Sequence, residues 1–399
     1  MKALSDRIQN IAPSLTVAID TLAKKLKAEG KDIVSLGAGE PDFETPAEIR
    51  KAGKAAIDAG KTRYTAPQGI FEVREAVSHK LLSQNGLRYK PEQIIMTSGA
   101  KHAIFDSLMA LVNPGDEIVI PEPYWVTYPE LVKLLGGVPV IVHTRPENDF
   151  QMTGEELSRV LTPRTKALIL NNPTNPTGTL YSEKALSEIA QIAIANDLYA
   201  ISDEVYEHFS YSDSFKFKSL AQIDGMYERT IVVNGLSKSH CMTGWRIGYA
   251  AAPEEIAKLI AKAQGQTTHH PSNVAQYAAK KALELPLDGV FAMRDAFRKR
   301  RDFFFNKIAS VPGVSARMPQ GAFYLFADIH AVLGKNAPGG KRIDSSADLC
   351  AYLLESEGLA IVPGSAFGRE GFVRFSYAAS METLSAAAER FERGILALC

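Results

Sequence analysis

Lys238 lies in a part of the chain where a reactive amine has the neighbours that it needs. An apolar stretch, residues 230–234, runs directly into a turn of small and hydroxyl-bearing residues that contains Ser237 and Lys238. Eight residues further on, Arg246 adds a second cation. Cations and hydroxyl groups suit a phosphate, and an amine beside a phosphate pocket is what a pyridoxal phosphate (PLP) site requires. The alternative for Lys238 is an ordinary solvated lysine.

Three other apolar stretches are also followed by polar or aromatic side chains. Asp203 follows residues 198–202 and could pair with a pyridinium nitrogen, while Tyr206 could hydrogen-bond the phenolate oxygen of the same ring. The alternative is a helix N-cap at Asp203 with Tyr206 as packing. Asn175 lies in a turn with two Asn-Pro steps, which is either a ligand-facing turn or an ordinary connection. Trp125 could cover an aromatic ring or belong to the core.

Two further segments could bind anions. The turn Gly99-Ala100-Lys101 joins a predicted strand to a predicted helix, and the backbone N–H groups at a helix N-terminus bind phosphate. Many strand-to-helix joints look like this one. Arg374 interrupts an apolar alternation, so it is either an outward-facing strand residue or a buried clamp for a carboxylate.

The elements that must position these residues follow a repeating pattern from about residue 94. Short apolar runs alternate with turns and with amphipathic stretches of helical spacing, which predicts an α/β fold with a mostly parallel sheet. The predicted strands are residues 94–97, 117–121, 138–142, 167–170, 198–202, 230–234 and 246–250, with helices starting near 101, 124, 182 and 253. In such sheets ligands bind at the carboxyl ends of the strands, which is where the candidate residues fall.

The pattern changes past about residue 290, where a long charged helix over 294–301 precedes shorter strands at 323–327 and 373–376. This predicts a second domain, with a surface loop at 334–341. The first 45 residues contain one predicted helix and a Gly/Pro turn, too little to fold alone. We therefore expect residues 1–45 to dock on the small domain, 46–290 to form the large PLP-binding domain, and 291–399 to form the small domain.

Composition narrows the class of partner. The 399 residues include 46% hydrophobic residues, and 45 acidic residues balance 45 basic ones. Neither a nucleic-acid partner nor a membrane surface is indicated, so a small molecule is expected. The three cysteines favour neither a disulfide framework nor a metal site. Residues 1–7 have no apolar core and no run of about 18 apolar residues occurs, so we expect a soluble, cytoplasmic protein.

Seven segments together carry a resemblance to a known family. They are residues 37–43, 63–69, 123–125, 175–178, 203–206, 237–238 and 364–368. On these segments the chain resembles the class I (fold type I) PLP-dependent aminotransferases over essentially its whole length, and among them the bacterial aspartate aminotransferases of the subgroup that includes prephenate aminotransferases. The resemblance implies a large domain with a mostly parallel seven-stranded sheet between helices and a smaller α+β domain.

The resemblance also assigns roles. Lys238 would form the Schiff base with PLP and then move the proton, Asp203 would hold the pyridine nitrogen, and Tyr206 the phenolic oxygen. Asn175 would contact that oxygen and the substrate carboxylate, which Arg374 would grip. Further cofactor and substrate contacts are implied for Gly39, Gly99, Ala100, Lys101, Trp125, Ser237 and Arg246.

Other implied features concern the substrate and a second subunit. Tyr64 matches a tyrosine that reaches the phosphate of the neighbouring subunit, which implies a homodimer with shared sites. Lys101, Ser14 and Thr16 match residues that help to hold a distal carboxylate. The implied reaction is a reversible ping-pong transfer of the amino group from L-aspartate to 2-oxoglutarate. Alternatives are an aminotransferase for aromatic, alanine or prephenate substrates, or a PLP-dependent C–S lyase.

Departures from the family pattern affect the substrate range. Ala12 stands where relatives with prephenate activity often carry a lysine, which weakens the prephenate interpretation. The phosphate turn has Ala100 where close relatives commonly have a second glycine, a change that a loop of backbone donors can tolerate. His269 and His270 replace a run of small hydroxyl residues, and they either tune the substrate range or form a surface turn.

Overall fold

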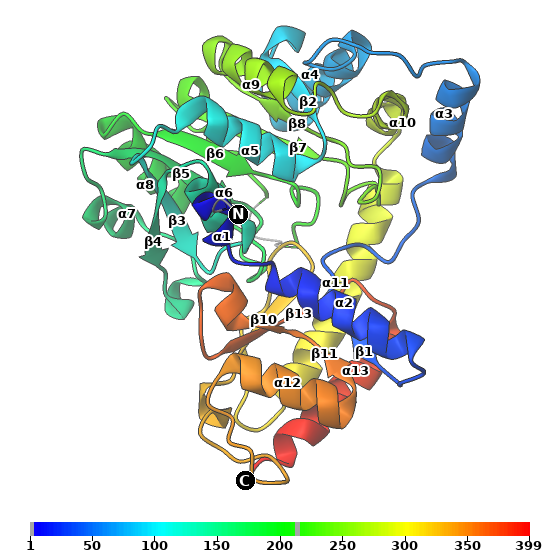
Figure 1. Ribbon diagram of the computed structural model, residues 1–399, viewed down its shortest axis with the longest axis vertical. Coiled ribbons are helices and arrows are strands. Elements are labelled where there is room, and N and C mark those ends of the chain that lie inside the picture. Colours follow the sequence, from blue (N-terminus) through cyan, green and yellow to red (C-terminus); the bar gives the residue numbers. More distant parts are fainter. Residues whose placement is uncertain (1–3, 212–215) are drawn as a thin grey trace.

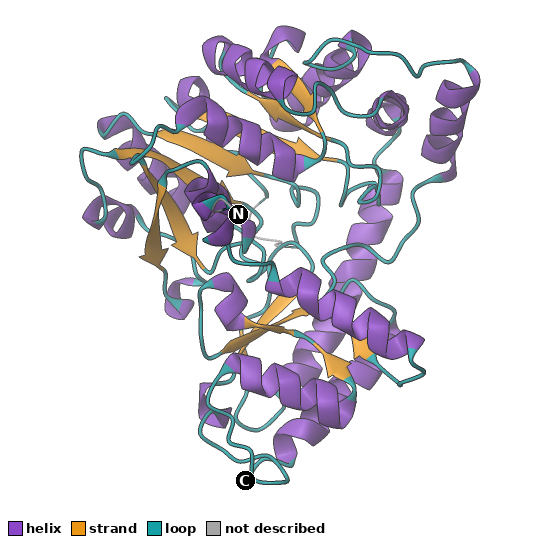
Figure 2. Cartoon of the chain, in the orientation of Figure 1, coloured by secondary structure: helices purple, strands orange, loops and turns teal. Residues whose placement is uncertain are grey.

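The chain builds two sheet-containing parts that are connected by one long helix. The structure is a computed structural model that describes residues 4–211 and 216–399, so the first three residues of the polar N-terminal stretch lie outside the described part. Figure 1 shows the larger part above the smaller one, with α11 (Asp288–Ala309) running from one to the other. Figure 2 shows helices packed around the strands of both parts.

The larger part is built on a seven-stranded sheet in the order β2-β8-β7-β6-β5-β3-β4. Its strands are β2 (Ile94–Thr97), β3 (Glu117–Glu122), β4 (Val138–His143), β5 (Thr165–Asn171), β6 (Tyr199–Asp203), β7 (Thr230–Gly235) and β8 (Gly248–Ala251). Neighbouring strands from β7 to β4 pair in parallel, whereas β8 runs antiparallel to both of its neighbours. The predicted mostly parallel sheet is therefore confirmed.

One strand boundary differs from the prediction in a way that affects the site. The strand expected from residue 246 begins at Gly248, and Arg246 lies in the preceding turn with a positive φ of 52°. A strand residue would alternate between the two faces of the sheet. In the turn, Arg246 is instead free to reach back toward Ser98 and Gly99.

Helices cover both faces of this sheet, which explains why its strands read as continuous apolar runs. On one face α5 (Ala100–Leu111) and α9 (Glu254–Gln266) pack over Ile118 and Ile201. On the other face Val119 and Leu168 pack under α8. The remaining helices of this part are α3 (Ala47–Asp58), α4 (Phe71–Asn85), α6 (Thr127–Leu134), α7 (Gly154–Arg159), α8 (Glu183–Ala195) and α10 (Asn273–Glu284).

Local capping sets where several helices begin. The Ser182 hydroxyl accepts a hydrogen bond from the Ala185 N–H at 3.2 Å, and this caps α8 at the predicted position. Thr153 and Glu156 form a capping box at the start of α7. The helix expected near residue 124 begins at Thr127, because the Tyr124 N–H is bound to the Phe367 carbonyl at 3.2 Å and holds the chain outside the helix.

The smaller part contains an antiparallel sheet in the order β12-β13-β10-β9 and a parallel pair, β1 and β11. These strands are β1 (Val34–Ser35), β9 (Ser315–Ala316), β10 (Tyr324–Asp328), β11 (Leu359–Ala360), β12 (Val362–Pro363) and β13 (Phe372–Ser376). They pack against α11, α12 (Ser346–Glu357) and α13 (Met381–Leu396). Phe375 on β13 lies between Phe304 and Phe391, at ring-centroid distances of 5.3 and 5.1 Å, so the helices and the sheet share one core.

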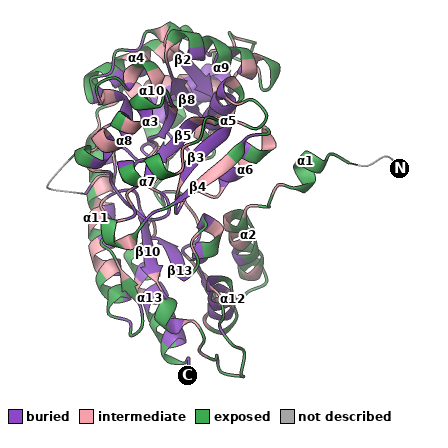
Figure 3. Ribbon diagram, turned by 90° about the vertical axis from the view of Figure 1, so that its left-hand side faces the viewer, coloured by how far each residue is buried: buried purple, intermediate pink, exposed green. Residues whose placement is uncertain are grey.

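The N-terminal segment has two helices where the sequence predicted one. These are α1 (Asp6–Gln9), which has no buried residue, and α2 (Leu15–Ala28). Figure 3 shows α1 projecting from the body of the chain. Between them, the Ala12 N–H donates to Glu130 on α6 at 2.9 Å. Further along, β1 pairs with β11, so this segment is attached to the smaller part.

The remaining elements are short 3-10 turns. They are Pro91–Gln93, Pro146–Asn148, Leu220–Gln222, Tyr227–Arg229, His330–Val332 and Gly364–Phe367. None of the helices in the described part of the chain has the length and apolarity needed to cross a membrane.

Candidate active site

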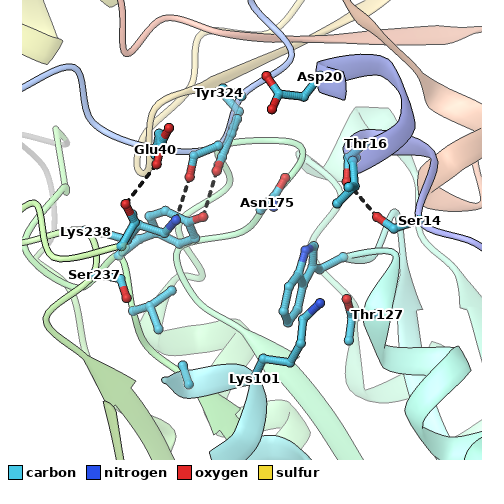
Figure 4. A pocket seen from close by; sticks show the side chains of 18 of the residues that line it. Ser14, Thr16, Asp20, Glu40, Lys101, Thr127, Asn175, Ser237, Lys238 and Tyr324 are labelled. Carbon is cyan, nitrogen blue, oxygen red and sulfur yellow. Dashed lines mark hydrogen bonds between the residues drawn. The ribbon is translucent and has the colours of Figure 1, made fainter. Parts of the chain in front are cut away.

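One pocket of about 470 Å³ collects most of the candidate residues from distant parts of the chain. It lies where the carboxyl ends of β5, β6 and β7 face the loop before Asp42 and the strands β10 and β13 of the smaller part. Figure 4 shows this pocket from close by. The predicted residues that line it are Ser14, Thr16, Gly39, Ala100, Lys101, Trp125, Asn175, Asp203, Tyr206, Ser237, Lys238, Arg246 and Arg374.

The Lys238 amine points into this pocket. Its Nζ donates a hydrogen bond of 2.5 Å to the Gly39 carbonyl and lies 5.9 Å from the centre of the Tyr206 ring. Burial lowers the pKa of Lys238 to about 8. The carboxylate of Glu40 opposes this shift, and the positive charge of Arg246 adds to it. The amine is therefore far easier to deprotonate than a solvated lysine, as a nucleophile or general base requires.

Asp203 ends β6 with its carboxylate buried in the pocket. Oδ2 accepts a hydrogen bond from the Tyr128 hydroxyl at 2.6 Å, and the residue is 3% exposed. Burial raises the pKa of Asp203 to about 6, although the Tyr128 hydrogen bond and the positive charge of Lys238 both lower it. No helix begins at Asp203, so the N-cap interpretation is wrong. An ionised carboxylate in this position can accept a hydrogen bond from a protonated ring nitrogen and stabilise its positive charge.

Tyr206 is buried three residues further on. Its hydroxyl lies 2.7 Å from the hydroxyl of Tyr324 on β10, and either group can donate. Burial raises the pKa of Tyr206 well above its ordinary value. The Tyr206 phenol is therefore protonated at neutral pH and can donate a hydrogen bond to an anionic oxygen.

Arg374 lies on β13 with its guanidinium directed at the pocket. It donates to Asn175 Oδ1 at 3.1 Å and to the Gly37 carbonyl at 2.5 Å. The side chain is 2% exposed, and its guanidinium stacks 4.7 Å from the centre of the Tyr324 ring. Among the described residues its Nε has no hydrogen-bond partner and no carboxylate pairs with it. Arg374 is thus a buried residue that faces the pocket and not an outward-facing strand residue, and its guanidinium could bind a carboxylate there.

The turn at the start of α5 and the turn before β8 meet at one corner of the pocket. Gly99 has φ +86°, and a Cβ on it would lie 2.6 Å from Nη2 of Arg246. Arg246 also donates to the Thr243 and Ser98 carbonyls, at 3.0 and 3.4 Å. Ala100 and Ser237 line the same pocket, whereas Gly99 does not. Backbone N–H groups, a hydroxyl and a guanidinium are the donors that a phosphate needs.

Another set of polar side chains, Lys101, Ser14 and Thr16, also lines the pocket. The Lys101 ammonium is 5.0 Å from the centre of the Trp125 ring, and burial lowers the pKa of Lys101. The hydroxyls of Ser14 and Thr16, at the start of α2, are 3.0 Å apart and face the pocket. Trp125 packs edge-on against Tyr128 at 5.4 Å, so it belongs to the core and the pocket wall together.

Tyr64 does not join the pocket of its own chain. It is 89% exposed, and its ring makes edge contacts with His269 and His270 at 5.5 and 6.0 Å. The His270 Nε2 accepts a hydrogen bond from the Thr65 N–H at 3.3 Å. The two histidines therefore form part of a turn whose imidazole rings contact an exposed tyrosine ring.

The residues present fit PLP. The pocket offers an amine, a carboxylate for the ring nitrogen, a protonated phenol for the ring oxygen and donors for the phosphate. Close packing also leaves room only for glycine at its edge, because a Cβ on Gly39 would lie 2.7 Å from the Tyr324 hydroxyl.

The sequence did not reveal several residues of the pocket. Tyr128 binds Asp203, Tyr324 binds Tyr206, and Glu40 accepts a hydrogen bond of 2.8 Å from Thr243. Tyr128 follows Tyr124 by one helical turn after the β3 exit, which is a weak signal that could have found it. Tyr324 lies inside a strand of the other part, and its spacing in the sequence carries no such signal.

Comparison with known proteins gives similarities over the full length. A family model described as aminotransferase class I and II matches residues 31–391. The aspartate/prephenate aminotransferase of Cereibacter sphaeroides is 43% identical over 394 residues, and the aspartate aminotransferase of Geobacillus stearothermophilus is 42% identical over 391, each covering 98% of both chains.

Solved structures agree. The aspartate aminotransferase from Rhizobium meliloti matches with a TM-score of 0.96 at 40% identity, covering 100% of both chains. The aspartate aminotransferase from Thermus thermophilus with maleate matches with a TM-score of 0.92 at 42% identity, covering 98% of this chain and 100% of that one. The similarity therefore includes both sheets and the pocket between them.

Proposed function

Because the chain belongs to the class I and II aminotransferase family, we propose that it is an aspartate aminotransferase, which moves the amino group of L-aspartate reversibly to 2-oxoglutarate and yields oxaloacetate and L-glutamate. The chain is a PLP-dependent aminotransferase by family. The observation that carries the proposal is the Lys238 amine in one pocket with Asp203, Tyr206 and Arg374.

The choice of a dicarboxylic substrate is supported by the charges in the pocket. Arg374 suits the α-carboxylate, and Lys101 is a second cation that pairs with no described carboxylate. The hydroxyls of Ser14 and Thr16 are two further donors for a distal carboxylate. The T. thermophilus relative was solved with maleate, a four-carbon dicarboxylate, which supports the same substrate class for this chain.

In the proposed mechanism, side chains hold the cofactor and substrate before any proton moves. Ser237, Arg246 and the 99–101 turn would bind the phosphate, while Tyr206 would donate to the ring oxygen and Asp203 would keep the ring nitrogen protonated. When bound, PLP supplies an electron-withdrawing ring that takes up the charge left on the substrate Cα. Trp125 covers one side of the site, and Asn175 holds Arg374 in its clamping orientation.

Lys238 moves the proton in this mechanism. Its Nζ would accept the proton of the substrate Cα as a general base and then donate it as a general acid to the cofactor carbon, not back to Cα. A pKa near 8 suits both steps at neutral pH, because the amine changes its protonation state easily there. Because the same amine can accept and donate this proton, Lys238 would serve the second substrate in the same way, with the direction of proton transfer reversed.

We also propose a homodimer with shared sites and the division of the chain near residues 45 and 290. Support for the dimer is the exposed Tyr64 ring, which is held against His269 and His270 outside the pocket of its own chain. Support for the division is α11, which starts at Asp288 and packs on α13, β9 and β10.

A panel of amino donors tests the proposed function. The purified protein should be yellow and lose its visible band on borohydride reduction. Aspartate and glutamate should have the highest kcat/KM with 2-oxoglutarate or oxaloacetate, and Lys238→Ala should abolish transfer. Preference for an aromatic donor, for alanine or for prephenate as the acceptor would contradict the aspartate assignment, and release of pyruvate by β-elimination would indicate a C–S lyase.

A further inference from the structure

Four buried polar side chains form a cluster behind the site, between α4, β7 and the loop after β6. We call Lys80, Asn85, Glu207 and Asn234 the Glu207 cluster; each is at most 8% exposed. Lys80 pairs with the Glu207 carboxylate and donates to Asn85 Oδ1 at 2.8 Å. The side-chain amides of Asn85 and Asn234 donate to Glu207 at 2.8 and 2.7 Å. One carboxylate thus receives three donors from two elements.

The cluster is attached to both loops that carry the central residues of the site. Glu207 directly follows Tyr206 in the loop after β6. Asn234 lies four residues before Lys238, and its Oδ1 accepts a hydrogen bond of 2.7 Å from the Gly235 N–H. The Glu207 to Asn234 hydrogen bond therefore joins the start of the Lys238 loop to the residue next to Tyr206, and Lys80 anchors both to α4.

Stability alone is a poor explanation for this arrangement. A buried ion pair costs so much desolvation that apolar side chains of similar volume often replace it without loss of stability. None of these four residues lines the pocket that contains Lys238, so they do not contact a substrate or cofactor there. The remaining explanation is positional: a carboxylate with all its hydrogen bonds made holds the segments that it joins in one fixed geometry.

We propose that the Glu207 cluster is a clamp that sets the position of Lys238 relative to Tyr206, with Glu207 and Lys80 as positioning residues for the proton transfer. This inference rests on the proposed function of Lys238. If the clamp is lost, the Lys238 amine should remain in the pocket but spend less time within proton-transfer distance of the substrate Cα. We therefore expect kcat to fall more than substrate affinity.

The Glu207 carboxylate is ionised over the neutral range. Burial by itself would raise the pKa of Glu207, but the charge of Lys80, together with His208 and the hydrogen bonds from Lys80 and Asn85, lowers it to about 2. Burial lowers the pKa of His208 and brings that of the nearby His240 to about 4. Glu207 is thus ionised and both histidines are neutral near pH 7.

Glu207→Gln in the cofactor-loaded protein is the first test. We expect kcat for aspartate to fall by roughly 10- to 100-fold while KM changes little, because a small misplacement of a reacting group has that effect. The visible circular dichroism of the bound cofactor should weaken, since it reports a fixed orientation. Hydrogen exchange of residues 235–240 should become faster.

A matched control and a double variant separate positioning from stability. Glu117 is also a buried carboxylate, bound by Thr162, Thr165 and Arg164 at the amino end of β3, away from the site. Glu117→Gln should lower Tm without changing kcat, dichroism or exchange at 235–240. In the double variant Lys80→Met with Glu207→Gln, no buried charge is left unpaired, so Tm should rise toward the wild-type value while kcat stays low.

Three outcomes decide the inference. If Glu207→Gln keeps the wild-type kcat, or if the double variant regains kcat together with Tm, the cluster is only structural and the inference is wrong. If exchange at residues 235–240 is unchanged while kcat falls, the clamp is not the cause and the inference is also wrong. A wild-type protein without a visible band or aspartate transfer would instead overturn the proposed function.

Discussion

The reactivity of the Lys238 amine depends on its surroundings. Burial lowers its pKa to about 8, below the value of about 10.5 for a solvated lysine. Only the neutral amine attacks an aldehyde. The rate at which cofactor-free protein captures PLP should therefore rise with pH and level off above about pH 8, as stopped-flow absorbance would measure. A rate that still rises toward pH 10 would mean that Lys238 is solvated.

In the proposed function, selectivity for dicarboxylic substrates depends on Lys101. Lys101→Ala should lower kcat/KM for aspartate by roughly 10- to 100-fold and for alanine far less, because only aspartate loses a charged hydrogen bond. Lys133→Ala, which removes an exposed lysine paired with Glu130 on α6, is the control and should change neither value. Equal losses for the two substrates would contradict the assignment of Lys101.

Tyr128 sets the charge on Asp203 in the proposed mechanism. Its hydrogen bond lowers the Asp203 pKa, so Tyr128→Phe should raise that pKa above about 6 and leave more Asp203 protonated at neutral pH. Asp203 then holds the ring nitrogen less well, and kcat should fall roughly tenfold at neutral pH. The loss should shrink as the pH rises, because Asp203 ionises again.

Tyr181→Phe provides the control for this prediction. Tyr181 is another buried tyrosine, and its hydroxyl accepts a hydrogen bond from the Met152 N–H at 3.1 Å, outside the pocket lining. Its replacement should affect Tm but not the pH dependence of kcat. If both variants show the same pH dependence, Tyr128 has no particular effect on Asp203.

The sequence located the pocket residues that occupy strand ends or motif positions, but not those that act through them. Lys238, Asp203 and Asn175 lie at or within a few residues of the ends of buried apolar runs, so their place at the sheet edge could be inferred. Tyr324 reaches Tyr206 from a strand more than one hundred residues away, and no pattern in the sequence predicts the hydrogen bond between Asn234 and Glu207. Contacts between distant segments depend on the packing of the two parts, which periodicity does not encode.

At the scale of elements, the turn before α5 depends on a glycine. Gly99 has φ +86°, and a Cβ on it would lie only 2.6 Å from Nη2 of Arg246. Gly99→Ala should strain the turn and displace the guanidinium, so PLP affinity, measured by equilibrium dialysis, should fall roughly tenfold or more. Gly86→Ala is the control: φ is +67° there, but a Cβ would have no heavy atom within 4 Å. It should lower Tm and leave PLP affinity unchanged.

The strands of the large sheet were predictable because helices bury both faces, which makes each strand a short, nearly continuous apolar run. The direction of β8 could not be predicted, because an apolar run reads the same in a parallel and an antiparallel strand. Its antiparallel pairing with β7 depends on the turn that contains Arg246. The second N-terminal helix, α1, was missed because its four residues have no buried face and therefore no periodicity.

At the scale of the whole molecule, the site is assembled from both parts of the chain. Lys238 and Asp203 come from the large sheet, whereas Tyr324 and Arg374 come from β10 and β13 of the smaller part. Any change in how the two parts pack would move Arg374, the proposed clamp for the α-carboxylate, relative to the Lys238 amine. Residues in α11, which connects them, should therefore influence turnover without touching substrate.

The proposed dimer makes a prediction about two inactive variants. Tyr64→Ala should remove the contact that this tyrosine makes with the phosphate in the site of the other subunit. Lys238→Ala should remove the amine from the site of its own chain. A hybrid dimer of the two would hold one site with the Lys238 of one chain and the Tyr64 of the other. Mixing the variants under conditions that allow subunit exchange should therefore restore up to about one quarter of the wild-type activity, the share of intact sites at random reassociation.

The same mixture also separates this arrangement from its alternative. If Tyr64 served the pocket of its own chain, every site in every hybrid would lack either Tyr64 or Lys238, and mixing would restore nothing. The exposure of Tyr64 argues against that arrangement, since its ring contacts His269 and His270 and lies outside the pocket lining of its chain. Mixing Lys238→Ala with Asp203→Ala is the control: both residues line the same pocket of one chain, so no hybrid site is complete and no activity should return.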